Sequence, residues 1–328
     1  MSPQKISKET YIKEKLLKWY KVNSRLLPWR IKKGGKLPNP YNIFISEYML
    51  QQTTVTSVIS KYNEFIKLWP SVKKLSKIRE PTILSFWSGL GYYNRAKNLL
   101  KSIKIIAKKY NFLIPQEYNI LIQLPGIGDY TAKAILGIAY NKKFMPVDAN
   151  IERIFARIYC LNNNLTKEKK NIKNISEKFI SKNNSSNLIQ AFMDYGSAVC
   201  LPRNPKCEIC KIKKYCLSYK KNIVHLVPKK SNVKKNKILK FSRAYVILNN
   251  QKQILVRKRP SIGMLASMIE VPNDKWVINK KNLVHDKIIQ KIRKKMKLKG
   301  LIKHSFSHFN IEVEVFFIQV NKNIFSDL

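Results

Sequence analysis

Residues 118–140 read YNILIQLPGIGDYTAKAILGIAY, and they set the architecture expected of the N-terminal two-thirds of the chain. Apolar residues at helical spacing flank the turn Leu124–Gly128, which predicts a helix, a tight turn and a second helix. Gly126 and Gly128 permit a turn whose backbone N–H groups point outward at the start of the second helix, where a phosphate can bind. The same pattern also fits an ordinary interhelical turn, so this stretch alone leaves both interpretations open.

Four of the five cysteines follow this stretch in the spacing C-x6-C-x2-C-x5-C, at Cys200, Cys207, Cys210 and Cys216. One compact loop, 200–216, can bring the four sulfurs onto a single metal centre. Disulfides are disfavoured in a cytosolic chain, so the spacing leaves zinc and an iron–sulfur cluster as alternatives. Cys160 stands alone in an apolar helical pattern and is expected to be a core residue.

Two carboxylates stand out on either side of the predicted hairpin. Glu47, within FISEYMLQQT, is acidic in a largely apolar helical stretch, an environment that raises a carboxyl pKa and suits a general acid. Asp148, within MPVDANIERI, immediately precedes a predicted helix and can accept backbone N–H bonds as its N-cap. Taken alone, each carboxylate also has a purely structural interpretation, as a cap or as a solvated charge.

The composition indicates a folded protein with an anionic partner. The chain has 328 residues, 45% of them apolar, which is enough for two packed domains. Lys and Arg number 64 against 19 Asp and Glu, and the formal charge of +45 favours nucleic acid, although a general Lys/Asn/Ile bias explains part of it. No apolar run approaches the ~20 residues of a membrane span, and the N-terminus lacks a signal-peptide core. We expect a cytosolic protein without a membrane partner.

The pattern along the chain changes from helical to strand-like. Amphipathic or apolar helical spacing occurs at 10–20, 54–69, 95–110, 131–140, 150–160 and 186–198. Residues 221–239 are lysine-rich and aperiodic, which indicates a linker between a helical domain at 1–220 and a small α+β domain at 240–328. Within the second domain, strands are predicted at 241–248, 253–259 and 311–320.

In this order along the chain, Glu47, the LPGIG turn, Asp148 and the four cysteines resemble the endonuclease III superfamily of helix-hairpin-helix DNA glycosylases. SEYMLQQT (46–53), GLGYYNRAKNL (89–99) and VDANIERI (147–154) look like its adenine-specific, MutY-type members. The resemblance implies a mainly α, two-lobed helix-hairpin-helix fold, a loop that holds one [4Fe-4S] cluster, and a small α+β Nudix-like C-terminal domain.

The resemblance also implies a monofunctional reaction. Where bifunctional relatives carry a catalytic lysine after the hairpin, this sequence has Tyr130, and a tyrosine cannot form a Schiff base with the sugar. Glu47 would protonate a flipped adenine at N7, and an ionised Asp148 would stabilise the oxocarbenium-like sugar. Tyr130 and Asn150 would position water and the sugar. The expected product is an abasic site.

Further positions match functional residues of the family. Gln52 and Tyr92 match residues wedged into the base stack, Thr53 lies beside the lesion strand, and the hairpin would contact DNA through Leu124, Gly126 and Gly128. Tyr92 also fits simple packing in a Gly-rich corner. The adenine-pocket positions are Trp29, Arg30, Leu50, Gln190 and Asp194. In the cluster loop, phosphate contacts are expected from Lys206, Lys211 and Lys213.

The tail resembles a Nudix-like domain that recognises 8-oxoguanine. HSFSHF (304–309) is the matching stretch, in which Ser307 and His308 would contact the oxidised guanine and Phe306 would pack beneath. No G-x5-E-x7-R-E-x2-E-E-x-G box is present, so nucleotide hydrolysis is not expected. The resemblance implies a monomer acting in the bacterial cytoplasm, at the nucleoid, on double-stranded DNA with A:8-oxoguanine or A:G mispairs.

Two other functions compete with this one. An endonuclease III-type thymine-glycol or mismatch glycosylase shares the hairpin and the cysteine loop, but Tyr130, the QQT after Leu50 and the C-terminal domain argue against it. A non-enzymatic DNA-binding protein with a structural metal site would also explain the charge and the hairpin. Release of free adenine separates the enzyme from the binding protein.

Overall fold

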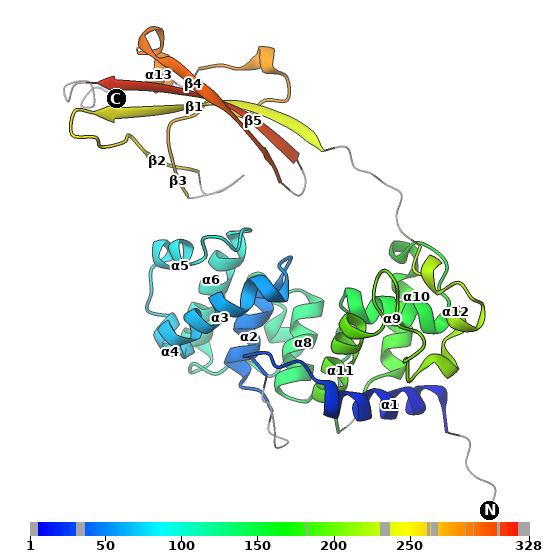
Figure 1. The fold of residues 1–328 in the computed structure, drawn as a ribbon. Helices are drawn as coiled ribbons and strands as arrows, with labels where there is room; N and C mark the ends of the chain where they lie inside the picture. Colours follow the sequence, from blue (N-terminus) through cyan, green and yellow to red (C-terminus); the bar gives the residue numbers. More distant parts are fainter. Residues whose placement is uncertain are drawn as a thin grey trace, which may run out of the picture. The chain divides into compact units, whose positions relative to one another are not determined.

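The chain forms two compact units, Met1–Ser231 and Asn232–Leu328 (Figure 1). The computed structural model describes residues 6–30, 37–181, 183–229, 237–260, 263, 268–285, 287–290, 292–306 and 309–320. The first unit is helical and the second is built on a sheet. Residues 221–229, which lie in the predicted linker, still belong to the first unit, where Val227 is buried and its carbonyl accepts a hydrogen bond from Arg157.

Helices form where the apolar spacing predicts them, with ends within three residues of the predicted ends. The helices of the first unit are α1 (Lys8–Asn23), α2 (Pro40–Leu50), α3 (Val55–Leu68), α4 (Val72–Leu75), α5 (Glu80–Phe86), α6 (Asn94–Lys109), α7 (Tyr118–Leu121), α8 (Asp129–Ala139), α9 (Ala149–Tyr159), α10 (Leu165–Lys178), α11 (Ser185–Ala198) and α12 (Leu217–Lys220). Side-chain caps fix several of their starts; Asn39 caps α2, for example, and Thr54 caps α3. None of the described helices is both long and apolar enough to cross a membrane.

The helices of the first unit gather into two lobes (Figure 1). Helices α2 to α6 and α8 form one lobe, and α9 to α12 together with α1 form the other. Helix α11 contacts α1, α8 and α9, so it joins the lobes. A continuous core of buried apolar side chains runs through both, and its largest fully buried members include Trp87, Phe65, Phe155 and Phe192. Burial of this apolar surface holds the lobes as one body.

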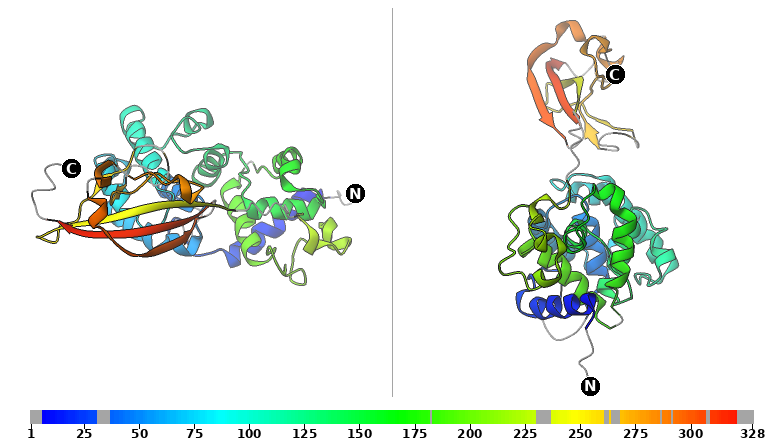
Figure 2. Two further views of the ribbon diagram at one scale, coloured as in Figure 1. Left: turned by 90° about the horizontal axis from the view of Figure 1, so that it is seen from above. Right: turned by 90° about the vertical axis from the view of Figure 1, so that its right-hand side faces the viewer.

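The second unit carries a three-stranded sheet in the order β1-β5-β4 (Figure 2). Strand β1 (Ile238–Asn249) runs parallel to β5 (Phe309–Val320), and β4 (Lys297–Ser305) pairs antiparallel with β5. A separate two-stranded ladder joins β2 (Arg257–Lys258) to β3 (Ile269–Glu270), and the short helix α13 spans Lys287–Gln290. The core of this unit consists of Tyr245, Ile247, Ile289, Ile292 and Val320.

Two details of the sheet differ from the sequence-based expectation. The strand predicted at 253–259 shrinks to the two residues of β2 and an isolated bridge at Ile254. Strand β4 was not predicted, because every one of its residues is exposed and its sequence, KLKGLIKHS, lacks the alternation of a half-buried strand. Pairing with β5 rather than burial therefore defines this edge strand.

Candidate active site

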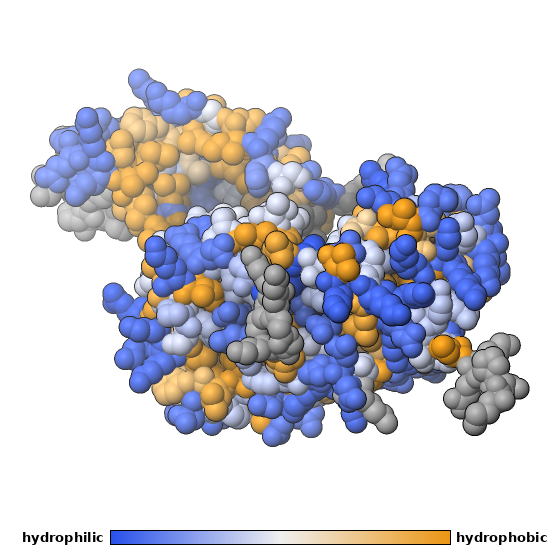
Figure 3. Space-filling model, turned by 60° about the horizontal axis from the view of Figure 1, so that its bottom comes forward, coloured by the Kyte–Doolittle hydropathy of each residue, from blue (hydrophilic) through white to orange (hydrophobic). Residues whose placement is uncertain are grey.

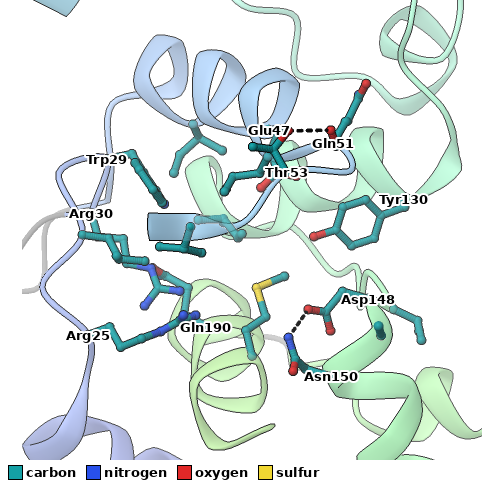
Figure 4. A pocket seen from close by; sticks show the side chains of 18 of the residues that line it. Arg25, Trp29, Arg30, Glu47, Gln51, Thr53, Tyr130, Asp148, Asn150 and Gln190 are labelled. Atoms are coloured by element: carbon teal, nitrogen blue, oxygen red, sulfur yellow. Dashed lines mark hydrogen bonds between the residues drawn. The ribbon is translucent and has the colours of Figure 1, made fainter. Parts of the chain in front are cut away.

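A cavity of about 480 Å³ opens in the helical unit, a size suited to a small organic group (Figure 4). Helix α2 contributes Glu47 and α8 contributes Tyr130. The start of α9 contributes Asp148 and Asn150, and α11 contributes Gln190. The predicted catalytic residues, separated by about 100 positions in sequence, therefore line one cavity.

Glu47 lies in the wall of this cavity and is buried, with only 7% of its surface exposed. Burial, and secondly the Asp148 carboxylate, raise the pKa of Glu47 to about 8, while the Arg30 guanidinium acts in the opposite direction. A carboxyl with this pKa is protonated at neutral pH. Glu47 can therefore donate a proton, as a general acid must.

Asp148 is both the cap of a helix and a carboxylate that lines the cavity. Its side chain is the N-cap of α9, where one carboxylate oxygen accepts the backbone N–H of Ile151 at 2.7 Å. The other oxygen accepts from the Asn150 amide at 2.8 Å (Figure 4). The positive end of the helix dipole favours negative charge at this position. The cap therefore fixes the carboxylate in the cavity wall and leaves it facing the cavity.

Tyr130 points its hydroxyl into the same cavity (Figure 4). Burial raises the pKa of Tyr130 well above its ordinary value, and the nearby carboxylates of Glu47 and Asp148 raise it further. The phenol is neutral in this environment and can donate or accept a hydrogen bond. It cannot act as the amine nucleophile of a Schiff-base mechanism.

An arginine-rich wall faces Glu47. Arg30 lines the cavity and donates to Asp194 at 2.7 Å, and Arg25 donates to the same carboxylate at 2.5 Å. Asp194 itself is fully buried and does not line the cavity. The carboxylate of Asp194 neutralises the Arg25 and Arg30 guanidiniums, so any effect of Asp194 on a bound base passes through these two residues.

The remaining predicted pocket residues do line the cavity. Trp29 is buried and packs edge-on against Tyr62, with ring centroids 5.1 Å apart, and Leu50 adds apolar surface. The Gln190 amide donates to the Ser186 carbonyl at 3.1 Å, while the Gln190 Oε1 atom is buried and has no hydrogen-bond partner among the described residues. An acceptor without a partner at this position is suited to an N–H donor on a bound group.

The two predicted wedge residues lie in tight loops. Gln52 and Tyr92 both adopt left-handed backbone conformations, with φ of 57° and 50°. Gln52 and Thr53 line the cavity mouth. Tyr92 is 42% exposed and lies outside the cavity lining, so it does not pack into a closed corner.

The turn between α7 and α8 has the geometry of a hairpin that can bind an anion. Gly126 has φ of +81°, and an added Cβ would lie 2.8 Å from the Asn98 Cβ, so only glycine fits. Gly128 is the N-cap of α8 and supplies no side chain, which leaves the first N–H groups of α8 without a side-chain acceptor. Leu124 is buried and anchors the turn to the core, so only its backbone is available to a ligand.

The four cysteines line a common recess over α9, and none of them forms a disulfide. Arg157, from α9, donates to the Cys200 sulfur at 3.3 Å and to the Leu201 carbonyl at 2.7 Å. Four thiols from one loop that line one recess are a donor set that an iron–sulfur cluster accepts.

The candidate 8-oxoguanine site is only partly described. Phe306 packs against His304 and Phe309, with ring centroids 4.6 and 4.8 Å away, and its backbone N–H donates to the Phe309 carbonyl. Ser307 and His308 lie outside the described residues. The predicted contact of Phe306 with an oxidised guanine therefore stays a prediction.

Sequence reasoning missed the buried arginines. Arg153 donates hydrogen bonds to the side-chain oxygen of Asn150 at 2.9 Å and to the backbone carbonyl of Cys200 at 2.8 Å. It therefore links the cavity to the cysteine loop. Arg95 and Arg157 are equally buried. Their signal in the sequence is an arginine inside an otherwise apolar helical stripe, since arginine is rarely buried without a partner.

Three family profiles match the chain. "HhH-GPD superfamily base excision DNA repair protein" covers residues 45–182, "Iron-sulfur binding domain of endonuclease III" covers 200–216, and "NUDIX domain" covers 243–326. The cysteine loop is therefore an iron–sulfur binding domain, and the cofactor it holds is a [4Fe-4S] cluster. The lysine-rich surface of the helical unit, largely hydrophilic on the face in Figure 3, agrees with a DNA partner.

Relatives that span both units carry a consistent name. A protein named adenine DNA glycosylase from Buchnera aphidicola subsp. Baizongia pistaciae is 38% identical over 95% of this chain and 87% of its own length. One of the same name from Buchnera aphidicola subsp. Acyrthosiphon pisum is 36% identical over 93% of this chain and 85% of its own length. A solved thermostable thymine-DNA glycosylase is 28% identical, with a TM-score of 0.58, over 65% of this chain and 97% of its own.

Proposed function

This chain belongs to the adenine DNA glycosylase family of base excision DNA repair proteins, and from that premise we propose that it hydrolyses the N-glycosidic bond of adenine in duplex DNA. The observation that carries the proposal is the pair of carboxyl groups in one cavity. Glu47 is buried and protonated, and Asp148 is capped and hydrogen-bonded. Carboxyl groups in such different environments are the arrangement that glycoside hydrolysis requires.

Each carboxyl group has one task in this reaction. Glu47 donates its proton to N7 of adenine, and the base, now cationic, takes the electron pair of the breaking C1′–N9 bond and leaves as neutral adenine. Asp148 stabilises the positive charge that develops on the sugar. Water then adds to C1′, and its proton passes to a carboxylate of the site. Asn150 and Tyr130 orient the water and the sugar through hydrogen bonds.

The wall opposite the catalytic pair supports a preference for adenine. The Gln190 Oε1 acceptor has no partner among the described residues and suits the exocyclic amine of adenine. Guanine presents a carbonyl oxygen at that position, which would leave two acceptors facing each other without a proton. Trp29 and Leu50 supply apolar surface for the face of the base.

Reaching the cavity requires that the adenine leave the helix. Gln52 and Tyr92 enter the base stack in this proposal, and Thr53 lies beside the lesion strand. The N–H groups at the start of α8, after Gly126 and Gly128, bind a phosphate. Further phosphate contacts come from the cysteine loop, through Lys206, Lys211 and Lys213.

The base opposite the adenine is assigned to the second unit. We propose that this base is 8-oxoguanine or guanine, that Ser307 and His308 contact it, and that Phe306 packs beneath it. Among the described residues, those that line the cavity and the cluster recess belong to the helical unit. One chain carries all of these parts, and we propose that it acts as a monomer on the bacterial chromosome in the cytoplasm.

The residues of the cluster recess hold the [4Fe-4S] cluster as a structural element. When bound, the cluster cross-links the loop 200–216 through its four thiolates. Arg157 orients one of these thiolates, and Arg153 ties the backbone of the same loop to Asn150. The chain's own carboxyl groups perform the chemistry.

A thymine-directed activity is the alternative favoured by one comparison. The solved thymine-DNA glycosylase matches about two-thirds of this chain, whereas the adenine glycosylases of Buchnera match both units. A thymine offers no N7 to Glu47, so the cavity chemistry also favours a purine.

Incubation with matched sets of duplexes tests the proposal. The duplexes carry adenine opposite 8-oxoguanine, adenine opposite guanine, adenine opposite thymine, or thymine opposite guanine. We expect free adenine from the first two and an abasic strand that breaks only after alkali treatment. Release of thymine, direct strand cleavage, or tight binding with no base release would each refute the proposed function.

A further inference from the structure

A single buried guanidinium holds the backbone of two loops that are far apart in sequence. Arg95, near the start of α6, is 7% exposed. Its Nη1 atom donates to the carbonyls of Met49 at 2.6 Å and Gln51 at 2.5 Å, and contacts that of Tyr48 at 3.3 Å. Its Nη2 atom donates to the carbonyls of Leu90 at 2.8 Å and Gly91 at 3.0 Å.

These carbonyls immediately precede the two proposed wedge residues. Gln51 is followed by Gln52, and Gly91 is followed by Tyr92. Both wedge residues are held with positive φ, a backbone conformation that is uncommon for residues other than glycine. The guanidinium carbon of Arg95 also lies 5.7 Å from the centre of the Tyr92 ring. Arg95 therefore contacts each loop at the residue that immediately precedes its proposed wedge residue.

Backbone carbonyls, and not a carboxylate, balance the charge of Arg95. No carboxylate among the described residues pairs with Arg95, and its Nε atom is buried without a hydrogen-bond partner. Burial lowers the pKa of Arg95 to about 10, against a smaller opposing effect of Tyr92. A buried cation is costly unless polar groups compensate it, and here the compensating groups are the carbonyls of the two loops.

We infer that Arg95 is a positioning residue for base flipping: it holds the Gln52 and Tyr92 loops at a fixed separation so that both wedges enter the base stack together. This inference rests on the proposed function, since it concerns how the adenine reaches the cavity. Arg95 does not line the cavity and has no part in bond cleavage. Its loss should therefore slow the opening of a base pair and leave the chemistry of an already unpaired adenine nearly unchanged.

Two duplexes separate flipping from chemistry. In one, adenine stands opposite 8-oxoguanine; in the other, it stands opposite a stable abasic analogue and is already unpaired, so its flipping is cheaper. The full-length, cluster-loaded protein is compared with Arg95→Met and Arg95→Lys under single-turnover conditions. Lys97→Met is the matched control, because Lys97 is a buried cation on the same helix and forms an ion pair with Glu80.

We expect Arg95→Met to slow adenine release from the paired duplex by about 10- to 100-fold, which corresponds to about 1.4–2.8 kcal/mol. Release from the unpaired duplex should change by less than about threefold. Arg95→Lys should show the same selectivity with a smaller loss, because one ammonium cannot reach both sets of carbonyls. Lys97→Met should be close to wild type on both duplexes.

Equal losses on the two duplexes would overturn the inference, as would wild-type rates in both Arg95 variants. If Arg95→Met fails to fold, as judged by its iron content, Arg95→Lys decides by the same ratio of rates. Should the wild-type protein release adenine from neither duplex, the proposed function fails, which is a result distinct from failure of the Arg95 inference alone.

Discussion

Glu47 should destabilise the helical unit at alkaline pH, and Glu47→Gln should remove that effect. Its pKa rises from an ordinary 4.5 to about 8, chiefly by burial. At 1.36 kcal/mol per pKa unit, this difference corresponds to about 5 kcal/mol. The folded protein binds the proton more tightly than the unfolded chain, so stability is full below pH 4.5 and is lost progressively as pH rises to about 8.

The observed loss should be smaller than this limit, because water entry and relaxation ease the burial of a charge. We expect about 2–4 kcal/mol between pH 5 and pH 8.5. For a unit of this size, that is a difference in Tm of about 5–10 °C. Glutamine has nearly the same shape and does not ionise. Glu47→Gln should therefore match the wild type at pH 5 and melt about 5–10 °C higher at pH 8.5.

Thermal melts of the helical signal, followed by circular dichroism across this pH range without DNA, measure the effect. Glu64→Gln controls for the loss of one negative charge, because that carboxylate is 57% exposed on α3. If Glu47→Gln and the wild type keep the same difference in Tm at every pH, the carboxyl group of Glu47 is not held protonated and the argument for its role as an acid fails.

Three further predictions concern charged side chains whose contacts the structure identifies. Asp194→Asn leaves the guanidiniums of Arg25 and Arg30 without their buried carboxylate; unfolding should become easier by about 3–5 kcal/mol in a urea titration, and an unchanged midpoint would contradict the assigned ion pairs. Asp129→Asn removes an exposed carboxylate from the first turn of α8, where it repels a DNA phosphate. Duplex binding, measured by fluorescence anisotropy, should become about two- to fivefold tighter at low salt, and the gain should disappear at high salt. Arg157→Met removes the donor to the Cys200 sulfur; iron content should fall below the about four irons per chain expected of the wild type, and full iron retention would show that the contact is dispensable.

The parts of the fold carried by local pattern were predictable from the sequence. The apolar spacing of residues 54–69 was enough to predict α3, and two glycines with a proline were enough to predict the turn before α8. The spacing of the cysteines predicted their common recess. In each case the signal lies within a few neighbouring residues, where backbone geometry alone fixes the outcome.

Features that depend on distant contacts were not predictable. Asp194 occupies a position typical of a pocket residue, but the loop after α1 folds back and places two arginines between it and the cavity. The carbonyls around Arg95 come from segments about 40 residues apart, and no pattern in either segment indicates that they meet. Strand β4 is an exposed edge strand and carries no periodic signal.

The most direct test of the central claim is the pH dependence of the single-turnover rate of adenine release from a duplex with adenine opposite 8-oxoguanine. With a proton on Glu47 as the catalytic acid, the rate should be level up to about pH 8 and then fall about tenfold per pH unit. Glu47→Gln should be slower by about 10²- to 10⁴-fold and should lack that decline. A wild-type rate that keeps rising through pH 9, or a Glu47→Gln rate within about threefold of the wild type, would contradict the assignment of Glu47 as the acid that breaks the bond.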